Sequence, residues 1–262
     1  MDLASPKVMG ILNVTPDSFY AFSRTEGERE IEERVKRIVE EGADIIDVGG
    51  CSTRPGYVSP SPDDEWQRVD LACSIIKKSW PEMPLSLDTF RAEIASRAID
   101  RWGVDIINDV SGGADPGMWP LVARKRVAYV LTHNRLDGSK DYEDVTANVI
   151  TELSWKLNEL HRLGVNDVIL DPGFGFAKTT EQNFRLLSEL QEVARMGYPL
   201  LAGISRKSMI YKTLGKNPEE TLAGTIALDA IALEKGAKIL RVHDVAEARD
   251  TVILFQKMKE EG

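Results

Sequence analysis

Cysteine is scarce in this sequence, and long apolar runs are missing. Only two cysteines occur among the 262 residues, Cys51 and Cys73, which is too few for a disulfide framework and suits a reducing compartment. No apolar run approaches the roughly 20 residues of a membrane-spanning helix, and no basic and apolar leader precedes Lys7. We therefore expect a cytoplasmic protein with no membrane partner.

Positive charge and histidine are also in short supply. The formal net charge is -9, which argues against an extended nucleic-acid surface and requires any anion site to be local. The three histidines, His133, His161 and His243, are dispersed and form no His-x-x-x-His or Cys-His cluster. A zinc site is therefore not expected.

Short apolar runs that end in a polar residue occur eight times along the chain. The terminal residues are Asn13, Asp47, Asp88, Asn108, His133, Asp171, Ser205 and Arg241. Helical patterns lie between or after them at 28–41, 63–79, 91–102, 116–124, 144–163, 180–196, 218–235 and 245–259. Eight strands alternating with helices in this length predict a single (β/α)8 TIM-barrel domain that spans residues 1–262.

An open doubly wound sheet is the competing arrangement. That fold would need a glycine-rich phosphate turn after the first strand, and the turn here, NVTPDSF, contains no glycine. The segment Val168 to Lys178, VILDPGFGFAK, fits the barrel well, because a buried parallel strand ends on Asp171 and breaks at once into proline and glycine. We therefore favour the closed barrel.

Polar residues at the carboxyl ends of barrel strands are expected to meet at one face. Asp88 and Asp171, with Asn108 between them in strand order, could accept hydrogen bonds from the N–H edges of a flat heterocycle. Acid/base catalysis by the two carboxylates, as in a glycosidase, is the rival interpretation, but nearby cationic residues favour an anionic ligand.

The cationic residues leave more than one role open. Lys207 in GISRKS could donate to a ligand heteroatom, contact an anion, or act as a Schiff-base nucleophile. Arg241 and His243 alternate along one strand end and, with Arg54, could bind a diphosphate. Magnesium, held mostly by diphosphate and water, could take Asn13 as its one protein ligand.

The quoted segments, taken together, resemble the dihydropteroate synthase family. MGILNVTPDSF, DVGGCSTRPG, LDTF, INDVSGG, THNR, DPGFGFAK, GISRKS and RVHDV occur in the family's order and cover nearly the whole chain. The resemblance implies a TIM barrel that joins 6-hydroxymethyl-7,8-dihydropterin diphosphate to p-aminobenzoate in folate synthesis. It also implies a homodimer and a target of sulfonamides. A pterin-binding methyltransferase domain that acts with a corrinoid partner is the alternative.

The resemblance also implies a role for each matched residue. The catalytic residues would be Asp88, Asp171 and Lys207. The pterin would be bound by Asp88, Asn108, Asp171, Phe176, Gly203 and Lys207. The diphosphate would be bound by Asn13, Arg54, Arg241 and His243, with Mg²⁺ at Asn13. The p-aminobenzoate would be bound by Phe19, Ser52, Thr53, Arg54, Pro55, Lys207 and Ser208. One departure concerns the fifth strand, which ends in THN where many relatives carry methionines around the histidine.

Overall fold

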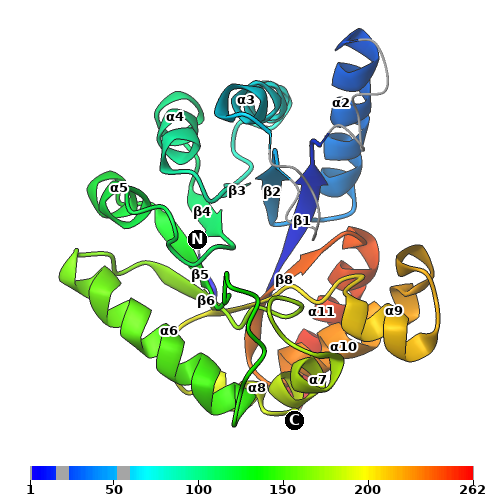
Figure 1. Ribbon diagram of the computed structural model, residues 1–262. Coiled ribbons are helices and arrows are strands. Elements are labelled where there is room, and N and C mark those ends of the chain that lie inside the picture. Colours follow the sequence, from blue (N-terminus) through cyan, green and yellow to red (C-terminus); the bar gives the residue numbers. More distant parts are fainter. Residues whose placement is uncertain (1, 16–23, 52–59, 262) are drawn as a thin grey trace.

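The computed structural model describes residues 2–15, 24–51 and 60–261. Eight parallel strands form a closed barrel in chain order, which confirms the (β/α)8 fold predicted from the sequence. The strands are β1 (Lys7–Asn13), β2 (Ile45–Gly49), β3 (Leu85–Asp88), β4 (Ile106–Asp109), β5 (Ala128–Thr132), β6 (Val168–Asp171), β7 (Leu200–Ala202) and β8 (Ala237–Val242). Figure 1 shows them at the centre of a ring of helices.

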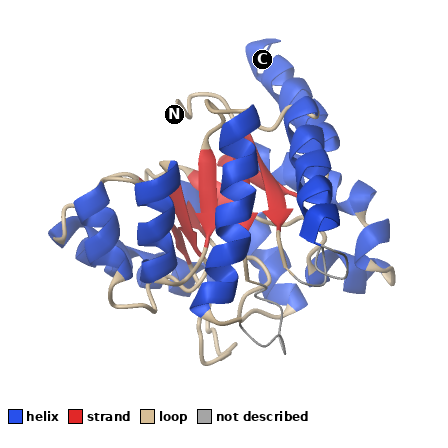
Figure 2. Cartoon of the chain, turned by 90° about the horizontal axis from the view of Figure 1, so that it is seen from above, coloured by secondary structure: helices blue, strands red, loops and turns tan. Residues whose placement is uncertain are grey.

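The helices outside the barrel are α2 (Arg24–Glu40), α3 (Pro62–Ser79), α4 (Ala92–Trp102), α5 (Met118–Lys125), α6 (Val145–Arg162), α7 (Thr180–Ser188), α8 (Leu190–Ala194), α9 (Ser208–Leu214), the 3-10 turn η1 (Pro218–Glu220), α10 (Leu222–Glu234) and α11 (Val245–Glu261). Figure 2 shows them packed around the strands. Local chemistry sets several helix starts. The Ser61 hydroxyl caps α3, and Thr179 and Gln182 form a reciprocal capping box at α7. None of the helices among the described residues is both long and apolar enough to cross a membrane.

Two of the predicted helical patterns are interrupted in the structure. The pattern over 180–196 splits into α7 and α8 at Glu189, whose backbone lies outside the helical region at φ -108°, ψ 15°. The pattern over 218–235 begins as η1 and continues as α10. The expected helix start in the run Ser205 to Ser208 is confirmed by α9, which begins at Ser208, but the extent of this helix was not predicted because seven residues are too few to display an amphipathic period.

Alternation of side chains along each strand separates two cores. Side chains on the outer face pack against the helices, whereas a second cluster fills the barrel interior. The buried interior residues are Met9, Ile45, Ile106, Val130, Ile169, Leu201 and Ile239. Since side chains repeat every second residue, positions two residues further along each strand face the same interior. Those positions include Asp47, Asn108, Thr132, Asp171 and Arg241. Polar groups therefore line the opening of the barrel at the carboxyl ends of its strands, which we call the mouth.

Candidate functional site

Strand register places the predicted site residues side by side at the mouth. Asn13 pairs with Gly49, Gly49 with Asp88, and Asp88 with Asn108, so one row crosses β1 to β4. The missing side chain of Gly49 matters here, because a Cβ atom at that position would lie 3.1 Å from Asn13 Oδ1. The polar ends of these strands therefore share one face, as the sequence predicts.

Arg241 joins three strands through the site. Its Nε donates to Asp47 Oδ2 at 2.6 Å, and its Nη2 donates to Asp88 Oδ2 at 2.6 Å. The Asn108 amide also donates to Asp47 Oδ2, at 3.1 Å. One carboxylate oxygen of Asp47 thus fixes both an arginine and an asparagine, while Asn108 Oδ1 has no hydrogen-bond partner among the described residues.

Burial and charge oppose each other in this network. Burial raises the pKa of Asp88 to about 7, with the Arg241 guanidinium opposing the rise and the Asp47 carboxylate adding to it. Burial alone would lower the pKa of Arg241, but the two carboxylates outweigh it and raise that pKa instead. The site therefore contains a permanently charged arginine beside a carboxyl group that can gain a proton near neutral pH.

Asp171 and Lys207 form the second half of the mouth. Asp171 is buried, and its Oδ1 accepts a 2.8 Å hydrogen bond from the Gly173 N–H. Burial lowers the pKa of Lys207 to about 8, while the nearby Asp171 carboxylate raises it, Arg241 lowers it and Asp88 raises it. The ammonium group of Lys207 also lies 4.2 Å from the centre of the Phe176 ring. The structure therefore brings Asp88, Asp171, Lys207 and Arg241 together.

His243 follows β8 and is held as a neutral imidazole. Burial, and then the charge of Arg241, lower its pKa to about 3. The Ser205 hydroxyl oxygen accepts from the His243 backbone N–H at 3.2 Å and lies 3.0 Å from Nδ1. If that hydroxyl donates to Nδ1, the proton of the ring is on Nε2, where it can be donated to an anion.

Gly203 and Ser208, two further residues predicted to bind the substrates, lie at the same mouth. Gly203 follows β7, and a Cβ atom there would meet only Leu201 at 3.8 Å among the described atoms. Ser208 is the first residue of α9, directly after Lys207, and is partly buried. Arg206 faces elsewhere, since it binds the Asp244 carboxylate through two nitrogens, at 3.1 and 2.6 Å.

The predicted p-aminobenzoate residues Phe19, Ser52, Thr53, Arg54 and Pro55 lie outside the described residues. For the same reason, the predicted contact of Arg54 with diphosphate stays a prediction. Asn13 is the predicted magnesium ligand, and its amide oxygen beside Gly49 is the hard oxygen donor that this ion prefers. No group of three or more His, Cys, Asp or Glu side chains in the described part of the chain could hold a metal by itself.

Two residues of the mouth were missed in the sequence. Asp47 was recognised only as a strand end, although it is fully buried and organises Arg241 and Asn108. At the end of β5 the inward residue is Thr132, whereas His133 bonds Glu152 of α6. The sequence did contain a signal for the role of Asp47. Its neighbours in the strand are apolar, which indicates burial, and a buried carboxylate needs a partner.

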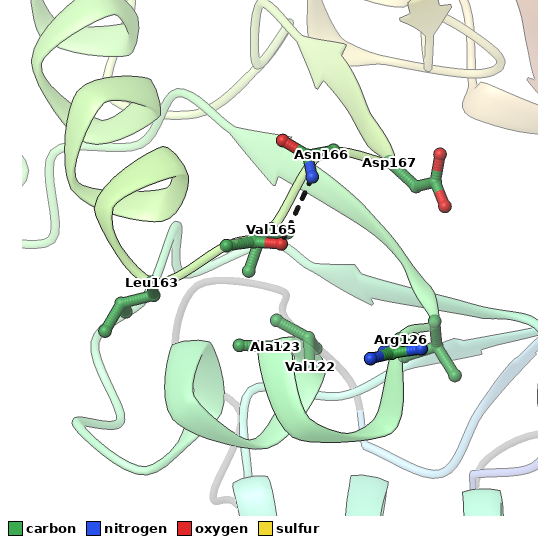
Figure 3. Close-up of a pocket in the computed structure, with 9 residues that line it drawn as sticks. Val122, Ala123, Arg126, Leu163, Val165, Asn166 and Asp167 are labelled. Atoms are coloured by element: carbon green, nitrogen blue, oxygen red, sulfur yellow. Dashed lines mark hydrogen bonds between the residues drawn. The ribbon is translucent and has the colours of Figure 1, made fainter.

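A separate cavity of about 450 Å³ lies where β5 and β6 begin, at the end of the barrel opposite the mouth. Residues before those strands line it, among them Arg126, Leu163 and Asp167 (Figure 3). The strand starts of such barrels serve stability, whereas activity resides at the carboxyl ends. The cavity is therefore not part of the candidate site.

The fold and the mouth define a barrel enzyme that binds a flat ligand through buried carboxyl and amide groups and an anionic tail through cations. A sequence model of the family described as "Pterin binding enzyme" matches residues 9–243. Dihydropteroate synthase from Clostridium beijerinckii is 41% identical over 244 residues, which cover 92% of this chain and 89% of the relative.

Two solved structures from Xanthomonas albilineans are similar throughout. Its dihydropteroate synthase with 4-aminobenzoic acid has a TM-score of 0.92 and 38% identity, covering 99% of this chain and 95% of that one. The complex of the enzyme with 7,8-dihydropteroate has a TM-score of 0.89 and 36% identity, with the same coverage. The chain therefore belongs to the dihydropteroate synthases, within the pterin binding enzyme family.

Proposed function

We propose that the protein joins 6-hydroxymethyl-7,8-dihydropterin diphosphate to p-aminobenzoate, which releases diphosphate and forms 7,8-dihydropteroate in folate synthesis. Within this family membership, the observation that carries the proposal is the convergence of Asp88, Asp171 and Lys207 around one mouth. Such a mouth offers acceptors for the N–H edge of a pterin and cations for its anionic tail. The cytoplasm is the proposed location, supported by the low cysteine content.

The geometry supports substitution at the exocyclic carbon of the pterin. The bond from this carbon to the diphosphate oxygen breaks, and its electron pair leaves with diphosphate. Arg241 and His243 would bind the departing anion, and the Asp171 carboxylate would stabilise the cation left on the pterin. The arylamine nitrogen then attacks the carbon and loses a proton to solvent. Our hypothesis is that departure precedes attack; a carbon isotope effect typical of a tight, associative displacement would contradict it.

A coupled assay with purified protein tests the function directly. Supplied with both substrates and magnesium, the protein is expected to release one diphosphate for each dihydropteroate formed. Diphosphate release that requires the arylamine distinguishes this reaction from methyl transfer, which produces none. Binding of the pterin without turnover under these conditions would contradict the proposed activity.

Magnesium is proposed to bind the diphosphate with Asn13 as its protein ligand, where it would neutralise charge on the leaving group. We expect Asn13→Ala to raise the magnesium concentration that gives half-maximal rate about tenfold, the equivalent of ~1.4 kcal/mol. The KM for p-aminobenzoate should not change. Titration of the initial rate with magnesium measures the effect. Asn166→Ala, at the exposed opposite end of the barrel, is the control; equal shifts in the two variants would argue against the assignment.

A homodimer is proposed through the α10–α11 face, which we define by the exposed apolar side chains Ile231, Ile253, Leu254 and Met258. These helices pack against each other (Figure 1), and such a surface favours a second copy of the chain. We expect Leu254→Glu to convert a dimer to a monomer in light scattering after size exclusion. Leu136→Glu, which also changes an exposed leucine, should remain dimeric. A monomeric wild type would refute the proposal.

A further inference from the structure

The loop that follows β6 carries two parts of the pterin site. Its Gly173 N–H holds the Asp171 carboxylate at 2.8 Å, and its Phe176 ring lies under the ammonium group of Lys207. The backbone is left-handed at Gly173, Gly175 and Ala177, with φ values of 74°, 81° and 45°. Ala177 has a Cβ atom, which makes this conformation unfavourable for it. The loop therefore needs an anchor.

Lys178 supplies that anchor from inside the protein. Its side-chain nitrogen donates to Gly173 O at 3.0 Å and to Phe176 O at 3.2 Å, and lies 2.9 Å from His133 Nδ1. Lys178 is only 5% exposed. An ammonium group has three donors and no acceptor, so these three contacts use all of them. Two of the three end on the backbone of the loop that positions Asp171 and Phe176.

His133 ties this anchor to helix α6. Because Nδ1 accepts from Lys178, the ring proton is assigned to Nε2, which lies 3.0 Å from Glu152 Oε2. Burial, and then the charge of Lys178, lower the pKa of His133 to about 3, so the ring is neutral and able to accept. Glu152 is held in turn by the Arg135 guanidinium, whose Nε lies 3.0 Å from Oε1. The loop is thus connected to α6 through three side chains.

We propose that Lys178 is a positioning residue for the reaction, which holds Asp171 and Phe176 in their pterin-binding geometry through the backbone of residues 173–176. This inference rests on the proposed function. The alternative is a purely structural role, in which the buried lysine only stabilises the fold. Two facts favour positioning: both carbonyl partners belong to residues that form the site, and the charge of Lys178 interacts with Asp171. Burial lowers the pKa of Lys178 to about 7, so the protein retains this amine at a cost in stability.

Lys178→Met separates the two roles, because it keeps the length of the side chain and removes the three hydrogen bonds. We expect the Kd for 6-hydroxymethylpterin to rise about tenfold, since small displacements of positioning groups are that costly. The Kd for inorganic diphosphate should change less than twofold. In turnover, kcat should fall and the KM of the pterin substrate should rise, with the KM of p-aminobenzoate unchanged. Hydrogen exchange of the peptide containing residues 172–178 should become faster.

Lys156→Met is the matched control. Lys156 of α6 is partly buried and also donates to a loop carbonyl, Gly112 O, at 2.9 Å, but this carbonyl belongs to the loop after β4. This variant should lose stability without a change in pterin affinity or in exchange of the 172–178 peptide. Glu152→Ala, at the more exposed end of the same chain of contacts, should weaken pterin binding in the same direction by a smaller factor. It keeps the test open if Lys178→Met does not fold.

The outcomes separate this inference from the proposed function. A wild-type protein that makes no dihydropteroate contradicts the function itself. Suppose instead that the wild type makes dihydropteroate while both Lys178→Met and Glu152→Ala bind 6-hydroxymethylpterin normally. This result refutes the positioning role and leaves the proposed function standing. A lower melting temperature with unchanged pterin affinity in folded Lys178→Met would likewise assign Lys178 to the fold alone.

Discussion

Asp171→Asn is expected to lower kcat about 10²–10³-fold, the usual cost of removing one electrostatic contact to developing charge. The fold should survive. Asparagine keeps an oxygen that can accept the 2.8 Å hydrogen bond from the Gly173 N–H. Burial raises the pKa of Asp171, so its charge does not favour the folded state, and we expect a change in melting temperature of no more than about 3 °C.

The same substitution should change how Lys207 titrates. Burial lowers the pKa of Lys207 to about 8, and Asp171 is the first group that opposes this. Without that carboxylate the pKa of Lys207 falls further, and its ammonium form is lost at a lower pH. The decline of the residual activity with rising pH should therefore begin at a lower pH than in the wild type. A pH profile of kcat/KM measures this. Asp167→Asn, at an exposed position just before the same strand, is the control. Near-normal turnover of Asp171→Asn would remove Asp171 from the catalytic residues.

Fold and mouth were predictable from the sequence because both depend on a short-range pattern. Each apolar run closes on a polar residue, and parallel strands carry their ends to one face. Asp88, Asn108 and Asp171 follow from that rule alone. The specific assignment to pterin and diphosphate did not follow from it, since the same carboxylates also fit a glycosidase; the ordered motifs decided the point.

What the sequence could not provide was pairing over long separations. Asp47 and Arg241 are 194 positions apart, and nothing in either segment indicates that they form an ion pair. The inward residue at the end of β5 was also missed, because Thr132 and His133 are both polar and the strand end was placed one residue late. Short helices such as α9 lack the length that a periodic pattern requires.

Arg241→Met is expected to produce the largest loss of stability, about 3–5 kcal/mol at neutral pH, because it leaves two buried carboxyl groups without their cation. Catalysis should be lost as well, since Arg241 is proposed to bind the diphosphate. Urea unfolding measures the stability. Arg249→Met is the control: it removes the ion pair of a more exposed arginine with Asp44, and its hydrogen bonds to the Gly42 carbonyl, at the other end of the barrel, which should cost less, about 1–2 kcal/mol. Equal losses in the two variants would contradict a special role for Arg241.

The pH dependence of the Arg241→Met deficit tests the physical cause. Burial raises the folded-state pKa of Asp88 to about 7, well above its ordinary value of 3.8, even though Arg241 opposes the rise. The folded protein therefore binds more protons than the unfolded chain between these values, and the contribution of Asp88 to stability falls as the pH rises through that window. Without Arg241 the folded-state pKa rises further and the window extends above pH 7.

The stability deficit of Arg241→Met should consequently be smaller at pH 5 than at pH 8. Asp88→Asn should restore part of the stability at pH 8 in the Arg241→Met background. A deficit that does not vary with pH and is not relieved by Asp88→Asn would mean that lost packing of the arginine side chain, rather than an unpaired buried charge, is the cause.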